Sequence, residues 1–182
     1  MSPMRTNFAA REDGFRFANA FDPRPRRAMP VLKNLTPSQM VIGLCGGMCY
    51  AALDYQRSGR AVPRFEAVDT LTPQLTGYLY RRQIESIPPL VLLRLADWLL
   101  RSDEYVGRKT CELELVRMRS LLNAGLPAVL CLVRTRGLAD PTRNHQVIAT
   151  GYEETSSGVL RIKLYDPNYP GQEPEMYVPE PW

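Results

Sequence analysis

The chain has 182 residues, of which 45% are hydrophobic and 23% charged, a composition typical of one globular domain with a sizeable core, alone or with a short extension. Its formal net charge is +4 and its pI is about 9.0, so nucleic acid has to be considered as a partner. No nucleic-acid motif accompanies the scattered arginines or their two local groups, which are Arg24, Arg26 and Arg27, and Arg57, Arg60 and Arg64. We therefore expect no nucleic-acid partner, because a solvated basic surface or an acidic protein partner explains the charge.

The sequence also disfavours membrane insertion and classical secretion. No apolar run approaches the ~20 residues that cross a bilayer, and the longest, at 88–100, is interrupted by Arg94 and Asp97. The N-terminus contains no apolar core of a secretory signal. We expect the run at 88–100 to form a buried helix, and the protein to be cytoplasmic or secreted without a classical signal peptide, with no membrane partner.

Two parts are expected along the chain. Residues 1–37 are rich in Pro and Arg, which favours an extended arm lying over the surface. Residues 38–182 form the main domain. A helix is predicted from Cys45 to near Gly59, because apolar residues recur at helical spacing before that glycine. The stretch 63–80 contains two prolines and a glycine and is interpreted as a loop with short turns.

The rest of the domain divides into a helical part and a strand part. Helices are predicted at 88–101 and at 111–124, where the second carries an apolar stripe that suits the core and is closed by Gly125. Four strands follow, at 128–134, 145–152, 159–165 and 176–179. Helices first and antiparallel strands afterwards indicate an α+β fold.

The four cysteines are Cys45, Cys49, Cys111 and Cys131. Without a signal peptide, and with a chain long enough to build a core, free thiols are expected rather than disulfides. Cys111 begins a helical stretch and Cys131 lies inside an apolar strand, so neither forms a close pair with a second metal ligand. Both are expected to be small buried side chains, and no metal site is predicted.

Cys45 is the strongest candidate for a reactive thiol. Gly43 precedes it and Gly46 and Gly47 follow it, so backbone can approach closely at the start of a helix. A thiol at a helix N-terminus faces the positive end of the macrodipole and free backbone N–H groups, which favour the thiolate. The same N–H groups can donate to an oxyanion that develops during acyl transfer. The simpler alternative is a buried cysteine beside glycines that helix packing requires.

Cys49 is the rival nucleophile, because it lies one helical turn beyond Cys45 on the same face. Gln39 favours Cys45, since it stands six residues before that cysteine and its amide can donate to an oxyanion. The residue at the same offset from Cys49 is Gly43, which has no side-chain donor. The alternative for Gln39 is an exposed loop residue.

His145 is the one histidine of the chain, and it opens a predicted strand. A thiol enzyme needs one base that titrates near neutral pH, so His145 is the candidate base. The alternative is a structural histidine, which is the commoner use of a lone one. Asn144 precedes it and is suited to orienting the ring or lining the site.

Asp166 follows the next apolar strand and precedes Pro167. A carboxylate at a strand end can reach a neighbouring strand, accept a hydrogen bond from one imidazole nitrogen and so fix the tautomer and orientation of the ring. The alternative is a turn-forming Asp-Pro pair. Asn168 is the fallback for the orienting residue.

Together these residues resemble the papain-like cysteine peptidase superfamily, and most closely its bacterial C39-type, bacteriocin-processing peptidases. That family carries a Gln, five residues, Cys-Gly, a helix of small apolar residues, a strand that opens with His, and an Asp-Pro after the following strand. The matching residues are Gln39, Cys45 with Gly46, His145 and Asp166. A second glycine after the cysteine and a longer helical region before the histidine depart from the family.

The resemblance implies a papain-like fold, with an N-terminal helical part packed on a C-terminal antiparallel sheet, and a cysteine peptidase. Its catalytic residues would be Cys45, His145, Asp166 and Gln39, its substrate a peptide or protein, and it would need no metal or organic cofactor. A bacterial toxin or effector with an inhibitory or immunity protein as partner fits the small size and basic charge. Two alternatives stay open: a transglutaminase-like acyl transferase, and a papain-fold binding module without catalysis.

Overall fold

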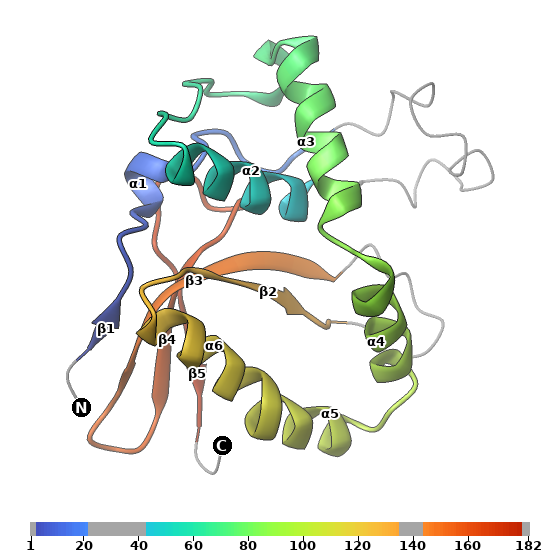
Figure 1. The fold of residues 1–182 in the computed structure, drawn as a ribbon, viewed down its shortest axis with the longest axis vertical. Coiled ribbons are helices and arrows are strands. Elements are labelled where there is room, and N and C mark those ends of the chain that lie inside the picture. Colours follow the sequence, from blue (N-terminus) through green and yellow to red (C-terminus); the bar gives the residue numbers. More distant parts are fainter. Residues whose placement is uncertain (1–2, 22–42, 135–143, 180–182) are drawn as a thin grey trace.

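An antiparallel sheet carries helices on both of its faces in the computed structural model, which describes residues 3–21, 43–134 and 144–179 (Figure 1). The helical elements are α1 (Ala10–Asp13), α2 (Cys45–Arg57), a 3-10 turn (Val68–Thr70), α3 (Pro73–Glu85), α4 (Pro89–Leu99), α5 (Asp103–Lys109), a π-helical segment (Thr110–Glu114) and α6 (Leu115–Asn123). The strands are β1 (Met4–Arg5), β2 (Ala128–Leu132), β3 (His145–Glu154), β4 (Leu160–Tyr165) and β5 (Glu175–Val178). The α+β class predicted from the sequence is confirmed.

The long strand β3 organises the sheet. β4 pairs along one side of β3 and β5 pairs with β4, whereas β2 and the short β1 share the other side of β3. β2 covers the first half of β3, where Leu132 lies opposite His145. His145 therefore stands at one end of the sheet, on a strand with neighbours on both sides.

The two faces of β3 are buried under different helices. Ile148, together with Tyr165 of β4, belongs to the core that α2 covers, and Val147 and Ala149 belong to the core that α6 covers. This alternation follows from the two-residue period of a strand. Because both faces are covered, the middle of β3 is apolar at successive positions rather than at every second one.

The N-terminal residues are part of the core, so the interpretation of residues 1–37 as a surface arm is wrong for 3–21. β1 joins the sheet through β3. Four phenylalanines are buried in the core that α2 covers, namely Phe8, Phe15, Phe17 and Phe21. Each aromatic ring buries a large apolar area, which decides how this segment packs. Most of the prolines and arginines that suggested an arm belong to 22–37, which lies outside the described residues.

Helix α3 occupies much of the stretch 63–80, which was interpreted as a loop. Thr72 is its N-cap, and the Thr72 hydroxyl accepts a hydrogen bond of 3.2 Å from the Leu75 N–H. Pro73 occupies the first helical position, where a missing N–H costs nothing and the fixed φ suits a helix. The Thr-Pro pair was therefore a helix start signal rather than a loop signal.

Helix α4 contradicts the expectation that the run at 88–100 is buried. None of its residues is buried, and Leu90 and Leu93 are 80% and 67% exposed. The apolar stripe predicted for 111–124 also reaches the core only in part. Leu115, Met118 and Leu122 are buried there, whereas further apolar positions predicted for the stripe, Leu113, Val116 and Leu121, are exposed.

The other predicted elements are confirmed to within a few residues. The helix from Cys45 ends at Arg57, and Gly59 then adopts a left-handed φ of 65°. The four predicted strands correspond to β2, β3, β4 and β5. Within the ranges that the structure describes, no helix is long and apolar enough to cross a membrane.

Candidate active site

Cys45 is the first residue of α2, and the start of this helix is anchored on both sides. The N–H of the N-cap residue Leu44 donates to Oδ1 of Asn19 at 2.6 Å. The N–H of Gly47 donates to Oε1 of Gln83 in α3 at 2.8 Å. These bonds satisfy donors that a helix start leaves unpaired and hold the Cys45 sulfur at the positive end of the helix dipole.

The glycine pair after Cys45 has a packing reason. A Cβ on Gly46 would collide with the carboxamide oxygen of Gln146, and a Cβ on Gly47 would collide with the backbone carbonyl oxygen of Leu79 in α3. Gly46 therefore lets α2 sit directly on β3, and Gly47 lets α3 cross α2 closely. The second glycine, which departs from the resembled family, serves the contact with α3.

His145 and Asp166 form a buried pair. Nε2 of His145 lies 2.7 Å from Oδ1 of Asp166, and both residues are about 95% buried, at 4% and 5% exposure. Asp166 is placed by β4, since it follows Tyr165, which pairs with Ile148 of β3. The fold therefore brings the histidine and this carboxylate together.

Asn168 also lies beside this pair. Its backbone N–H donates to Oδ1 of Asp166 at 2.8 Å, and its Nδ2 lies 3.3 Å from Nε2 of His145. The sequence offered Asp166 and Asn168 as alternative orienting residues. In the fold both contact the ring, with Asp166 the closer, and this arrangement leaves Nδ1 of the ring for the thiol.

The Cys45 thiol interacts with the His145 ring and accepts a hydrogen bond from the backbone of β3. The N–H of Gln146 donates to Sγ of Cys45 at 3.3 Å. Burial alone would raise the pKa of Cys45, but the hydrogen bond with His145, the Gln146 N–H, the His145 charge and the Gly46 N–H outweigh it, and the pKa is lowered. The lowered pKa makes the thiolate of Cys45 easier to form than that of an ordinary buried thiol.

The pKa of His145 moves in the complementary direction. Burial lowers it, but the hydrogen bonds to Asp166 and Cys45 and the charges of both groups prevail, and the pKa rises to about 9. A lowered thiol pKa beside a raised imidazole pKa favours a thiolate–imidazolium pair at neutral pH. This charge distribution is the one that nucleophilic thiol chemistry requires.

Cys49 contacts the same strand residue as Cys45, Gln146, but through its carbonyl oxygen rather than its N–H. Its thiol donates to the Gln146 carbonyl oxygen at 3.5 Å. Burial raises the pKa of Cys49 well above its usual value, and the charges of Cys45 and Asp166 add to that rise. Of the two cysteines on this face of α2, Cys45 has the histidine contact and the lowered pKa, so it is the nucleophile candidate.

Gln146 belongs to the site although the sequence analysis did not single it out. Its backbone N–H donates to Cys45 and its carbonyl oxygen accepts from Cys49, while its buried Nε2 donates to the Ser86 carbonyl oxygen at 3.4 Å. The Ser86 hydroxyl in turn donates to the Gln83 carbonyl oxygen at 2.8 Å. Gln146 thus ties β3 to the end of α3. The signal available in the sequence was a glutamine directly after the histidine, at the start of an otherwise apolar strand.

The remaining candidates have different positions. Gln39 lies outside the described residues. Asn144 accepts a hydrogen bond of 2.8 Å from the Arg134 N–H through its Oδ1, so it links the end of β2 to the start of β3. Cys111 is partly buried and Cys131 is exposed, which corrects the expectation that both are buried, because β2 is an edge strand.

No protein-family model, curated protein or solved structure matches this chain. The chemistry of the site is therefore inferred from the residues themselves. Among the described residues, no group of three or more His, Cys, Asp or Glu side chains is arranged to hold a metal ion. Cys45, His145 and Asp166 have the chemistry of a candidate nucleophile, a candidate proton carrier and a group that can orient that carrier.

Proposed function

We propose that this protein is a cysteine peptidase, in which Cys45 is the nucleophile, His145 the acid and base, and Asp166 the residue that positions His145. The observation that carries the proposal is the chain of contacts from the Cys45 thiol through the His145 ring to Asp166, whose Oδ1 is 2.7 Å from Nε2. This chain of contacts brings together residues that are far apart in the sequence, since 121 positions separate Cys45 from Asp166 (166 − 45 = 121). The lowered pKa of Cys45 and the raised pKa of His145 support the same assignment.

The reaction begins with attack of the Cys45 thiolate on the carbonyl carbon of a peptide bond. A C–S bond forms while the carbonyl electron pair moves onto oxygen. When the oxyanion collapses, the C–N bond breaks and the His145 imidazolium gives its proton to the leaving amine. Water then attacks the thioester, His145 takes a proton from that water, and the C–S bond breaks to restore the thiolate and the imidazolium.

The oxyanion would be stabilised at the start of α2. The backbone N–H of Cys45 belongs to the first turn of the helix, where N–H groups lack intrahelical partners and the dipole is positive. We propose Gln39 as the second donor, as its spacing before Cys45 suggests. Two donors aimed at a developing charge in a buried site are a large source of rate enhancement.

We also propose that the fold is of the papain type. The support is that a helix with the cysteine at its N-terminus lies against an antiparallel sheet whose central strand opens with the histidine. The third residue follows the neighbouring strand β4, so the site lies at the junction of the helical part and the sheet. This combination of elements is what the resemblance to papain-like peptidases implies.

A binding module without catalysis is the second candidate, and one observation favours it. Cys45 is only 7% exposed and His145 only 4% exposed. Little of either side chain can therefore be reached by a substrate carbonyl. A papain-type fold with an occluded site would keep all three residues in place and bind a partner elsewhere on its surface.

The decisive experiment is digestion of a proteome-derived peptide library by the full chain, read by mass spectrometry. Cys45→Ala and His145→Ala should each abolish cleavage almost as fully as the double variant, because nucleophile and base act as a unit. Cys131→Ser is the matched control and should cleave normally, since Cys131 is an exposed thiol on β2.

Three other outcomes would each replace the proposal. Cleavage that survives both Cys45→Ala and His145→Ala would belong to another protein in the sample. Release of ammonia from glutamine with incorporation of an added primary amine would identify a transglutaminase-like transferase. No cleavage by the wild type together with an unreactive Cys45 would identify the binding module.

A further inference from the structure

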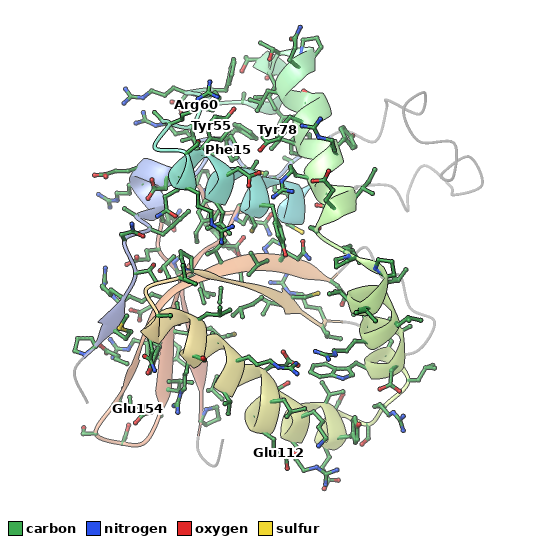
Figure 2. All side chains as sticks on the ribbon, viewed as in Figure 1. Phe15, Tyr55, Arg60, Tyr78, Glu112 and Glu154 are labelled. Carbon is green, nitrogen blue, oxygen red and sulfur yellow. The ribbon has the colours of Figure 1, made fainter. Side chains whose placement is uncertain are left out.

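A surface pocket of about 320 Å³ lies at the opposite end of α2 from Cys45. It is lined by Asp54, Tyr55, Ser58, Arg60 and Tyr78. Figure 2 shows Tyr55, Arg60 and Tyr78 grouped beside the C-terminal end of α2 and the adjacent part of α3. At 1.5 Å per residue, the 13 residues of α2 place this end about 18 Å from the catalytic candidate, so the pocket is a separate site.

Two tyrosines form the aromatic part of the pocket. The rings of Tyr55 and Tyr78 meet edge to face, with centroids 6.3 Å apart and an interplanar angle of 88°. The Tyr78 hydroxyl donates to Oδ2 of Asp54 at 2.6 Å. Burial, and then the bond to Asp54, raise the pKa of Tyr78 to about 12, so its hydroxyl keeps this proton and is occupied as a donor.

The pocket lining contains one carboxylate, Asp54, and one guanidinium, Arg60. The Asp54 carboxylate is paired with Arg82, whose Nε lies 2.7 Å from Oδ2, and Arg82 also pairs with Glu85, at 2.6 Å. Arg60 is held by its backbone, whose N–H donates to the Tyr55 carbonyl oxygen at 2.9 Å. Its guanidinium has no ion-pair partner among residues 3–21, 43–134 and 144–179. Of the two charged groups that line the pocket, Asp54 is thus engaged by Arg82, whereas Arg60 has no ion-pair partner in the described part of the chain.

Further arginines lie near the pocket in the chain or in space. Arg57 and Arg64 lie close to Arg60 in the chain, and neither forms an ion pair within the described part of the protein. The Arg81 guanidinium lies over the Tyr78 ring, 5.3 Å from its centroid. Of the sequence group Arg57, Arg60 and Arg64, Arg60 lines the pocket, and Arg57 precedes the lining residue Ser58 in the chain.

We propose that this pocket binds a single carboxylate of a peptide, either an acidic side chain or a free C-terminus. One planar guanidinium matches one carboxylate in a two-bond contact, and the tyrosine rings accept the adjoining apolar atoms. A phosphate group or a nucleic acid fits less well, because the Tyr78 hydroxyl is already used and the Asp54 carboxylate lies in the pocket wall. The site does not depend on the chemistry of Cys45.

The test is an NMR titration of the ¹⁵N-labelled full chain carrying Cys45→Ala, which removes any cleavage of the probe. Three short Gly-Ser peptides serve as probes: one with a single internal Glu and an amidated C-terminus, one with Gln and a free C-terminus, and one with Gln and an amidated C-terminus. We expect amide shifts at Ser58, Gly59, Arg60 and Tyr78 with one or both of the first two peptides at up to millimolar concentration, and none with the third. The responding peptide identifies the source of the carboxylate.

Variants separate this site from general charge attraction. Arg60→Gln should weaken binding about tenfold or more, because a charge-assisted contact is lost, and Arg60→Lys should retain only part of the affinity. Arg108→Gln on α5 is the matched control, since Arg108 is also exposed but lies on the other side of the sheet from α2, and its binding should equal that of the parent. Equal affinity of Arg60→Gln, equal shifts with the uncharged peptide, absence of shifts at these amides, or binding only of a phosphopeptide or an oligonucleotide would overturn the proposal.

Discussion

The Nε2 atom of His145 and the Oδ1 atom of Asp166 are 2.7 Å apart in the interior of the protein. The carboxylate thereby selects one of the two ring nitrogens and leaves the other for the Cys45 thiol. The contact depends on β4, which pairs with β3 and brings residues 21 positions apart in the chain to the same end of the sheet. From this relationship and its surroundings five predictions follow about reactivity, pH and stability.

Cys45 should be the first thiol to react with iodoacetamide at pH 6. Its pKa is lowered, whereas an ordinary thiol with a pKa near 8.5 is almost fully protonated at that pH. Peptide mapping after a brief exposure should find the label on Cys45, and Cys131→Ser should leave the rate unchanged. First labelling of Cys49 would transfer the role of nucleophile one helical turn along α2.

Activity and the stabilising effect of the ion pair should both decline as the pH rises through about 9. The folded pKa of His145 is raised to about 9 from 6.5, so the contribution of the imidazolium to stability is fully present below pH 6.5 and is lost as pH rises through the folded value. The difference in unfolding free energy between wild type and His145→Gln should therefore shrink between pH 7 and pH 10, as measured by urea unfolding. A constant difference over that range would contradict the raised pKa.

Asp166→Asn should slow turnover while leaving the fold intact. In serine triads the same change costs about 10⁴-fold. Because Asn168 also contacts Nε2 of His145, at 3.3 Å, and can keep part of the ring orientation, we expect about 10²–10³-fold here. The alkaline limb of the pH–rate profile should also move to lower pH, since the carboxylate that raises the His145 pKa is gone. Asn168→Ala, the matched control, should show the smaller effect.

Gly46→Ala should destabilise the fold by about 1–3 kcal/mol, the usual cost of overpacking. The added Cβ would meet the Gln146 carboxamide and the Ser86 hydroxyl, and α2 would have to move away from β3. Gly107→Ala in α5 is the matched control, because a Cβ there meets nothing within 4 Å and alanine favours a helix by about 0.5–1 kcal/mol. Urea unfolding of both variants should give opposite signs.

Gln39→Ala should lower turnover by about 10²–10³-fold, as loss of one oxyanion donor does in other acyl-transfer enzymes. The unfolding midpoint should stay near that of the wild type. Steady-state kinetics on a cleaved peptide from the library would provide the rate. An unchanged rate would assign the oxyanion to backbone N–H groups, with that of Cys45 as the first candidate.

Some of the structure was predictable from the sequence because its causes are local. The helix from Cys45 carries apolar residues at helical spacing and ends before Gly59, and the strands after Pro127 have the composition and turn signals of strands. Cys45, His145 and Asp166 could be selected because their chemistry, chain order and neighbours restrict the roles open to them. The α+β class follows from the order of these elements.

Other features depend on contacts between distant parts of the chain. The surface on which Phe15 and Phe17 are buried is formed by α2 and the sheet, so composition alone suggested an arm. Leu90 is exposed because the described fold sets no element over α4, although its sequence is as apolar as that of a core helix. The choice of Cys45 over Cys49 was decided by tertiary contacts with β3, because Cys45 interacts with His145 and the Gln146 N–H, whereas the Cys49 thiol donates to the Gln146 carbonyl oxygen. Spacing along a helix places both cysteines on one face. Only the packing of that face against β3 determines that the Cys45 sulfur meets the imidazole and that the Cys49 sulfur does not.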